Sequence, residues 1–64
     1  MVNKNKVEEI TRNFLQQHGD VFNVRVYDFE NGVWTTEAQV NSMSGDHLKK
    51  VKISDETGEI ISVE

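Results

Sequence analysis

The N-terminal part of the chain carries apolar side chains at helical spacing. An apolar residue recurs at positions i, i+3 and i+7, with one neighbour that widens the stripe: Val7, Ile10, Phe14 and Leu15. This period is typical of an amphipathic helix, which we predict from Lys6 to His18. Asn5 is expected to cap the first turn, with Glu8 as its capping-box partner. Gly19 is expected to end the helix, because glycine readily adopts the left-handed conformation found there.

From Val21 onward the apolar period changes to two, which predicts strands with one buried face. A three-residue loop, Glu30-Asn31-Gly32, keeps the apolar residues of both strands on one face, whereas a two-residue loop would mix apolar with polar side chains. The expected cross-strand pairs are Val26 with Thr36, Val24 with Ala38, and Phe22 with Val40.

A second hairpin is predicted at the C-terminal end of the chain. Its loop is Glu56-Thr57-Gly58, with Gly58 in the left-handed conformation and Asp55 bonded to the turn backbone. The expected pairs are Ile53 with Ile61 and Val51 with Val63. Between the hairpins, Asn41 to Asp46 is expected to form a polar loop. The pattern leaves the positions of Met43 and Leu48 open.

These elements predict one α+β domain over residues 1–64, in the order α-β-β-β-β. The N-terminal helix is expected to pack on one face of a four-stranded antiparallel meander sheet. The predicted core consists of Val7, Ile10, Phe14, Phe22, Val24, Val26, Trp34, Ala38, Val40, Val51, Ile53, Ile61 and Val63.

Composition narrows the function classes. A chain of 64 residues buries a small core, and without cysteine it can form neither a disulfide nor a thiolate metal site. The net charge of −4, from 11 acidic and 7 basic residues, opposes general attraction to nucleic acid or anionic membrane. No apolar run reaches the ~20 residues that span a bilayer, and no export signal is visible. We therefore expect a soluble, cytoplasmic protein.

Candidate catalytic and metal-binding groups are sparse. His18 lies near Asp20 and His47 near Asp46, but neither pair has the further ligands that a zinc site needs. The acidic stretch from Asp55 to Glu59 lacks the longer register of a calcium loop. Serine residues are present without a nucleophile elbow. The sequence therefore predicts a protein that is not an enzyme and has no cofactor and no metal.

The sheet face away from the helix is the candidate interaction surface. Tyr27 and Phe29 are expected to point away from the helix, with Val33 and Thr35 opposite them across the hairpin. Two readings remain open: a surface for a protein partner, or cross-strand packing that stiffens the hairpin. Ile60 could share this face.

Three of the seven basic residues are close together: Lys49, Lys50 and Lys52. They could contact phosphate or an acidic partner, or protect a strand edge from pairing with another chain. With the nearby aromatic residues they also leave open a single-stranded nucleic-acid binder, although the net charge disfavours it.

The element order and the C-terminal hairpin resemble the PepSY family. Members carry an aromatic-led strand like Val33-Trp34-Thr35-Thr36-Glu37 and an ending V-x-V-D-x-x-T-G-x-V/I. Here the ending corresponds to Val51-Lys52-Ile53-Ser54-Asp55-Glu56-Thr57-Gly58-Glu59-Ile60. Two features depart from the family pattern: no export signal is visible, and the segment from Asn41 to Asp46 is not the compact glycine turn expected there.

The PepSY resemblance implies a non-catalytic domain that binds or restrains a protein, often a peptidase. It transfers no individual site residue. A weaker resemblance, to the gas-vesicle protein O family, implies an assembly accessory protein that self-associates. The expectation is therefore a protein-interaction or regulatory module with an unknown protein partner, present as a monomer or a weak homodimer.

Overall fold

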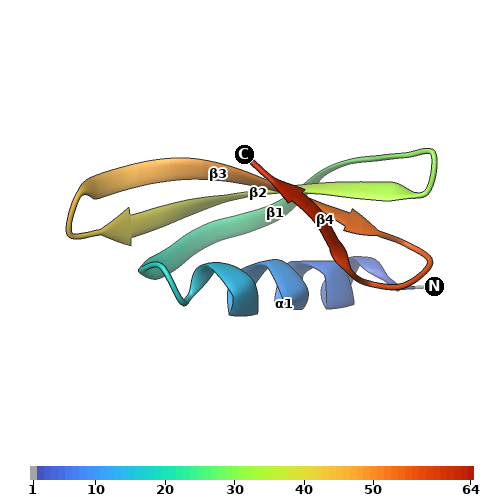
Figure 1. Cartoon of the computed structure of the whole chain (residues 1–64), viewed down its shortest axis with the longest axis horizontal. Helices are drawn as coiled ribbons and strands as arrows, with labels where there is room; N and C mark the ends of the chain where they lie inside the picture. The colour runs from blue at the N-terminus through green and yellow to red at the C-terminus, as the bar shows by residue number, and fades with distance from the viewer. Residues whose placement is uncertain (1) are drawn as a thin grey trace.

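The computed structural model describes residues 2–64 and contains one helix and one sheet. The helix α1 (Lys4–Leu15) precedes four strands: β1 (Asp20–Glu30), β2 (Val33–Ser42), β3 (Gly45–Ser54) and β4 (Ile60–Val63). The strands are antiparallel in the order β1-β2-β3-β4, and α1 lies over β1 and β2 (Figure 1). The predicted α-β-β-β-β fold class is thereby confirmed. Among the described residues, no helix has the length and hydrophobicity needed to cross a bilayer.

The helix begins earlier than its apolar pattern predicts. Asn3, not Asn5, is the N-cap, and its side-chain oxygen accepts a hydrogen bond from the Lys6 N–H at 2.8 Å. Both asparagines suit this role. The tertiary structure selects Asn3 because the preceding residue, Val2, is held by a 3.1 Å hydrogen bond from its N–H to the Asp55 carbonyl.

The helix ends at Leu15, before the predicted end at His18. The connection to β1 turns sharply at Gly19. A Cβ atom at this position would collide with the Asn41 carbonyl oxygen and press against the Val40 side chain. Glycine is therefore needed at residue 19 because the backbone approaches the end of β2 closely, which differs from the helix-capping reason argued from the sequence.

The β1–β2 hairpin has a two-residue turn, so the predicted three-residue loop is wrong. Asn31 and Gly32 have φ angles of 53° and 75°, the conformation of a type I′ turn. A bulge at Tyr27 supplies the extra residue that the loop was expected to supply. As a result Val26 still lies opposite Thr36, as predicted.

A second irregularity in β1 separates Phe22 from Arg25, and Asn23 there has a φ of 55°. The register beyond it is shifted, so Val21, rather than Phe22, lies opposite Val40. The predicted core position of Phe22 is therefore wrong. Because a shift of one residue exchanges the two faces of a strand, Val21 packs against the core and Phe22 is exposed.

The β3–β4 hairpin keeps one predicted pair and loses the other. Val51 lies opposite Val63 as predicted, and Gly58 has the expected positive φ of 77°. A register shift then places Ile60, not Ile61, opposite Ile53. Ile60 consequently packs against the core, whereas Ile61 and Val63 are exposed, contrary to the prediction.

The segment predicted as a polar loop is mostly strand. Asn41 pairs with Asp46, and Ser42 pairs with Gly45, so the chain reverses through Met43 and Ser44 alone. The turn is compact. The expectation that this segment is not a compact turn is therefore wrong. The uninterrupted β2–β3 register places Leu48 opposite Gln39, away from the helix.

The buried core lies between α1 and the inner face of the sheet, the face that points toward α1. Its fully buried apolar residues are Val7, Leu15, Ala38, Val40, Val51 and Ile53. Two threonines are buried among them, and the Thr11 and Thr36 hydroxyl oxygens are 2.7 Å apart. The Thr11 hydroxyl is also within 3.0 Å of the Val7 carbonyl, and the Thr36 hydroxyl within 3.2 Å of the Val51 carbonyl. This pair connects α1 to β2 and β3.

Replacing Thr11 or Thr36 with valine is expected to lower the free energy of unfolding by about 1 kcal/mol each, because a buried hydrogen bond is lost while the shape is kept. The double variant should lose less free energy of unfolding than the two single variants together, because the hydrogen bond between the hydroxyls is lost only once. Urea titrations of the four proteins measure this coupling. Thr35→Val, on the opposite face, is the control. Strictly additive losses would show that the two hydroxyls do not interact.

Candidate functional site

Within residues 2–64, no helix lies over the face of the sheet opposite α1, which is called the outer face below. In β2 the residues directed toward α1 are Thr36, Ala38 and Val40, which are buried, so the alternate residues lie on the outer face. Cross-strand partners share a face, which extends the assignment to β1 and β3. The outer face carries Phe22, Arg25, Tyr27, Asp28, Glu30, Val33, Thr35, Glu37, Gln39, Leu48, Lys50 and Lys52.

Tyr27 lies near the middle of the outer face. The bulge at this residue places it beside Asp28 on the same face, and the Lys50 ammonium lies 5.2 Å from the centre of its ring. This distance is within the range of a cation–π interaction. Next to it, the Arg25 guanidinium forms a 3.0 Å ion pair with Glu37. An exposed aromatic ring is thus surrounded by charged groups.

The structure brings together three of the four predicted interaction residues. Tyr27, Val33 and Thr35 lie on the outer face, as expected. Phe29 does not, because the two-residue turn pairs it with Trp34, and their ring centroids are 4.4 Å apart. Phe29 therefore lies on the inner side of the sheet. The predicted direction of this side chain is wrong, and the reason is the incorrect loop length.

Three apolar outer-face residues were missed by the sequence interpretation: Phe22, Leu48 and Ile61. Phe22 and Leu48 flank Gln39 from the two neighbouring strands at one end of the face. Ile61 lies at the other end, where it lines a shallow depression with Val33, Thr35 and Lys52. The signal for Leu48 was present, because no regular register could place it on the buried face.

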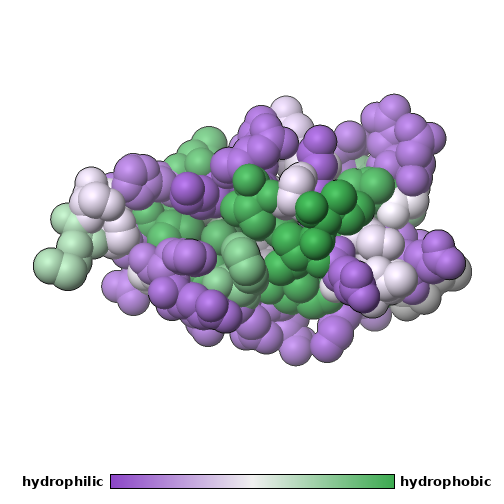
Figure 2. All heavy atoms as spheres, in the orientation of Figure 1, coloured by the Kyte–Doolittle hydropathy of each residue, from purple (hydrophilic) through white to green (hydrophobic). Residues whose placement is uncertain are grey.

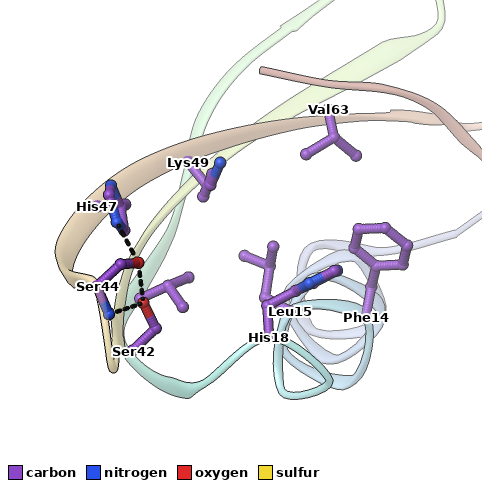
Figure 3. Close-up of a pocket in the computed structure, with 9 residues that line it drawn as sticks. Phe14, Leu15, His18, Ser42, Ser44, His47, Lys49 and Val63 are labelled. Carbon is purple, nitrogen blue, oxygen red and sulfur yellow. Dashed lines mark hydrogen bonds between the residues drawn. The ribbon is translucent and has the colours of Figure 1, made fainter.

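On the other side of the sheet, an inner hollow of about 480 Å³ lies between the end of α1 and the β2–β3 hairpin (Figure 3). Its apolar lining consists of Phe14, Leu15, Val40 and Val63. Its polar lining consists of His18, Ser42, Ser44, His47 and Lys49. The two histidines, which the sequence places in two separate local pairs with Asp20 and Asp46, therefore face one hollow.

The polar groups of the hollow form a short chain of contacts. The Ser44 hydroxyl lies 3.3 Å from His47 Nε2 and 3.0 Å from the Ser42 hydroxyl (Figure 3). His18 packs against Phe14, with ring centroids 5.7 Å apart. A serine activated by histidine needs a third group that orients the imidazole, usually a carboxylate. The side chains that line the hollow do not include a carboxylate.

Within residues 2–64, no three His, Asp or Glu side chains are grouped so that they could hold a metal ion. In the acidic turn, the Asp55 carboxylate accepts a 2.9 Å hydrogen bond from the Trp34 indole N–H. The predicted bond of Asp55 to its own turn is thus replaced by a contact with β2. This carboxylate joins the β3–β4 turn to the sheet.

Comparisons with known proteins supply no functional assignment, so the interpretation of function depends on the geometry of the structure. The two segments on which the expectation of a PepSY-like domain rests form the first half of β2 and the β3–β4 hairpin. The chain matches no family model, no curated protein and no solved structure.

Proposed function

We propose that this chain is a non-catalytic, PepSY-like protein-binding module that contacts its partner through the outer face. The observation that supports this proposal is the number of large apolar side chains on a sheet face without a covering layer. Phe22, Tyr27, Leu48 and Ile61 are between 49% and 63% exposed. Apolar groups gathered on one face are characteristic of interaction surfaces, whereas scattered ones are ordinary.

The chemistry of the outer face favours a protein as the occupant. Aromatic and arginine side chains are enriched at protein interfaces, and here Tyr27 and Arg25 lie close together on β1. The ion pair of Arg25 with Glu37 balances the local charge. The net charge of −4 weakens any nucleic-acid alternative, which would rest on Lys50 and Lys52 alone.

Tyr27 is the residue that we place at the centre of the contact. It is exposed, and the Lys50 ammonium lies 5.2 Å from the centre of its ring. A tyrosine side chain has few rotatable bonds and therefore loses little conformational entropy on binding. Val33 and Thr35 extend the contact along β2, and Ile61 completes it beyond them.

A photocrosslinking amino acid at position 27 is expected to form an adduct with one protein in the cells that make this chain. The same amino acid at Asn13, on the exposed side of α1, is the matched control. With the crosslinked protein purified, Tyr27→Ser should weaken binding about tenfold or more, since a central aromatic contact is worth roughly 2 kcal/mol.

Met43→Ser, at the tip of the β2–β3 turn, changes an exposed apolar residue outside the proposed contact and should leave binding unchanged. Equal adducts from positions 13 and 27, or full binding by Tyr27→Ser, would contradict the proposal. Circular dichroism confirms that each variant is folded.

Self-association as an assembly accessory protein is the second candidate function. The observation that favours it is that, among the described residues, β1, β4 and the first half of β3 each have one side without a neighbouring strand. Such edges can pair with another chain. Amide NMR spectra over a dilution series distinguish the candidates: shifts along a strand edge support assembly, and shifts confined to Tyr27, Val33 and Thr35 support a contact between outer faces.

A further inference from the structure

Among residues 2–64, part of β3 has no paired strand on the side where β4 lies. β3 begins at Gly45, but β4 pairs only with its second half, from Lys50 to Ile53. Within the described residues, the segment 45–49 is therefore a strand edge on that side. It contains no proline and no bulge, and its pairing with β2 is regular throughout. We call this segment the β3 edge.

The backbone direction of the β3 edge follows from the pairing at Lys50. The Lys50 N–H donates to the Glu64 carbonyl at 3.0 Å, and the Glu64 N–H donates to the Lys50 carbonyl at 2.7 Å. Lys50 therefore directs its backbone groups toward β4. Since backbone groups alternate along a regular strand, Asp46 and Leu48 direct theirs to the same side. Two N–H donors and two carbonyl acceptors are thus available to an added strand.

The β3 edge borders the inner hollow. His47 and Lys49 lie on the inner face of the sheet and line the hollow, whose apolar floor includes Leu15 and Val63 (Figure 3). Figure 2 shows hydrophobic residues at the surface between the helix and the strands on the side where β4 crosses. An added strand would direct every second side chain toward this hollow.

The charge of the hollow indicates which side chains would fit. Lys49 supplies a cation, the two histidines and two serines can donate hydrogen bonds, and the lining includes no carboxylate. This contrasts with the acidic chain as a whole. Backbone pairing supplies affinity and side-chain pockets supply specificity when a strand adds to a sheet. An apolar side chain would fit the floor, and an acidic one would pair with Lys49.

A second copy of this chain does not offer these side chains. Antiparallel pairing of two β3 edges would place His47 opposite His47 and Lys49 opposite Gly45, so that a second β3 edge brings no carboxylate to Lys49. The other edge strands are β1, which is interrupted by two register shifts, and β4, which has 4 residues and one register shift in its pairing with β3. No edge of a second copy combines a regular strand with an apolar and an acidic side chain two residues apart on its inner face.

We propose that the β3 edge binds an extended segment of a partner polypeptide, which adds as a fifth strand antiparallel to β3. The segment carries an apolar and an acidic side chain two residues apart, both directed into the inner hollow. This site is separate from the outer-face surface proposed above. It involves the backbone of Asp46 and Leu48, whereas the outer-face surface involves side chains around Tyr27.

The test is a selection of random displayed heptapeptides against the wild-type protein, with counter-selection against Leu48→Pro. Proline removes an N–H that points away from β2, a position where edge strands tolerate it. The enriched peptides should alternate apolar and acidic residues with polar ones. A synthetic copy should bind Leu48→Pro about tenfold more weakly than wild type, and bind Leu48→Ala, which keeps the N–H, within about threefold of wild type.

Two further variants sharpen the test. Selection against Lys49→Glu should reverse the charge preference, so that basic rather than acidic peptides are enriched. Tyr27→Ser should bind the peptide selected on wild type with the wild-type affinity. Amide hydrogen exchange of the wild-type protein should slow at Asp46 and Leu48 when the peptide is added, a result that does not depend on how any variant folds.

Several results would overturn the proposal. The selection could enrich no peptide, or it could enrich peptides that lack acidic residues. Leu48→Ala and Leu48→Pro could also lose the same affinity for the synthetic peptide. Amide hydrogen exchange at Asp46 and Leu48 that does not change when the peptide is added would also contradict the proposal. A concentration-dependent dimer that Leu48→Pro abolishes would make a second copy the occupant instead. Failure of the outer-face proposal would leave these results unaffected, because they depend on the backbone of Asp46 and Leu48 and on the Lys49 side chain, not on the Tyr27 ring.

Discussion

Leu15→Ala is expected to destabilise the protein more than a substitution at any exposed position of α1. Leu15 is 1% exposed and joins the last turn of α1 to the sheet. Loss of a buried leucine side chain costs about 2–5 kcal/mol, because the transfer energy is lost and a cavity remains. A domain of this size has on the order of 3–10 kcal/mol in total. Urea unfolding followed by circular dichroism should show a much lower midpoint.

Two variants test whether the effect comes from the cavity. Leu15→Met conserves most of the volume and should cost less than about 1.5 kcal/mol. Asn13→Ala, at an exposed position of the same helix, should stay within about 0.5 kcal/mol of wild type. If Leu15→Ala were as stable as Asn13→Ala, the packing of α1 on the sheet would contribute little to stability.

Trp34→Ala is expected to have the second largest effect, about 3 kcal/mol. Trp34 packs against the core, stacks near Phe29, and donates its indole N–H to Asp55 at 2.9 Å. One side chain therefore connects β1, β2 and the β3–β4 turn. Thermal unfolding followed by circular dichroism measures the loss, because the substitution removes the tryptophan fluorescence.

Trp34→Phe separates packing from hydrogen bonding. It keeps an aromatic ring but removes the donor to Asp55, so a loss of about 1–2 kcal/mol is expected. Phe22→Ala, an aromatic truncation on the exposed outer face, is the matched control and should cost less than either variant. A loss in Trp34→Phe equal to that in Trp34→Ala would show that the hydrogen bond, not the ring, carries the stability.

The two proposed contact sites use different parts of the sheet. The outer-face surface depends on exposed side chains, and the β3 edge depends on backbone groups. Leu48 belongs to both, since its side chain lies on the outer face and its N–H points to the free edge. Comparison of Leu48→Ala with Leu48→Pro is therefore informative for both sites.

The candidate outer-face site could be predicted in part. Period-two alternation placed Val33 and Thr35 on the outer face, because β2 is regular from end to end. Tyr27 was also placed correctly. Phe29 was not, because its direction depends on where the extra residue of β1 is accommodated. Either a longer loop or a bulge satisfies the same pattern, and the structure has the bulge.

The inner hollow could not be predicted from the sequence. His18 and His47 are far apart in the chain, and no periodicity relates them. They face one hollow because the β2–β3 hairpin reaches past the end of α1. The β3 edge likewise depends on a difference in strand length, since β4 is much shorter than β3.

The sequence by itself determined the element types, their order and the pairs Val26–Thr36 and Val51–Val63. These follow from local periods of 3.6 and two residues and from turn glycines, which act within a few residues of the chain. Tertiary structure alone decided between adjacent alternatives, as between Asn3 and Asn5 at the N-cap. In β1 and β4 a single inserted residue exchanges the faces of a strand at little local cost, so packing against α1 selects the neighbour that is buried.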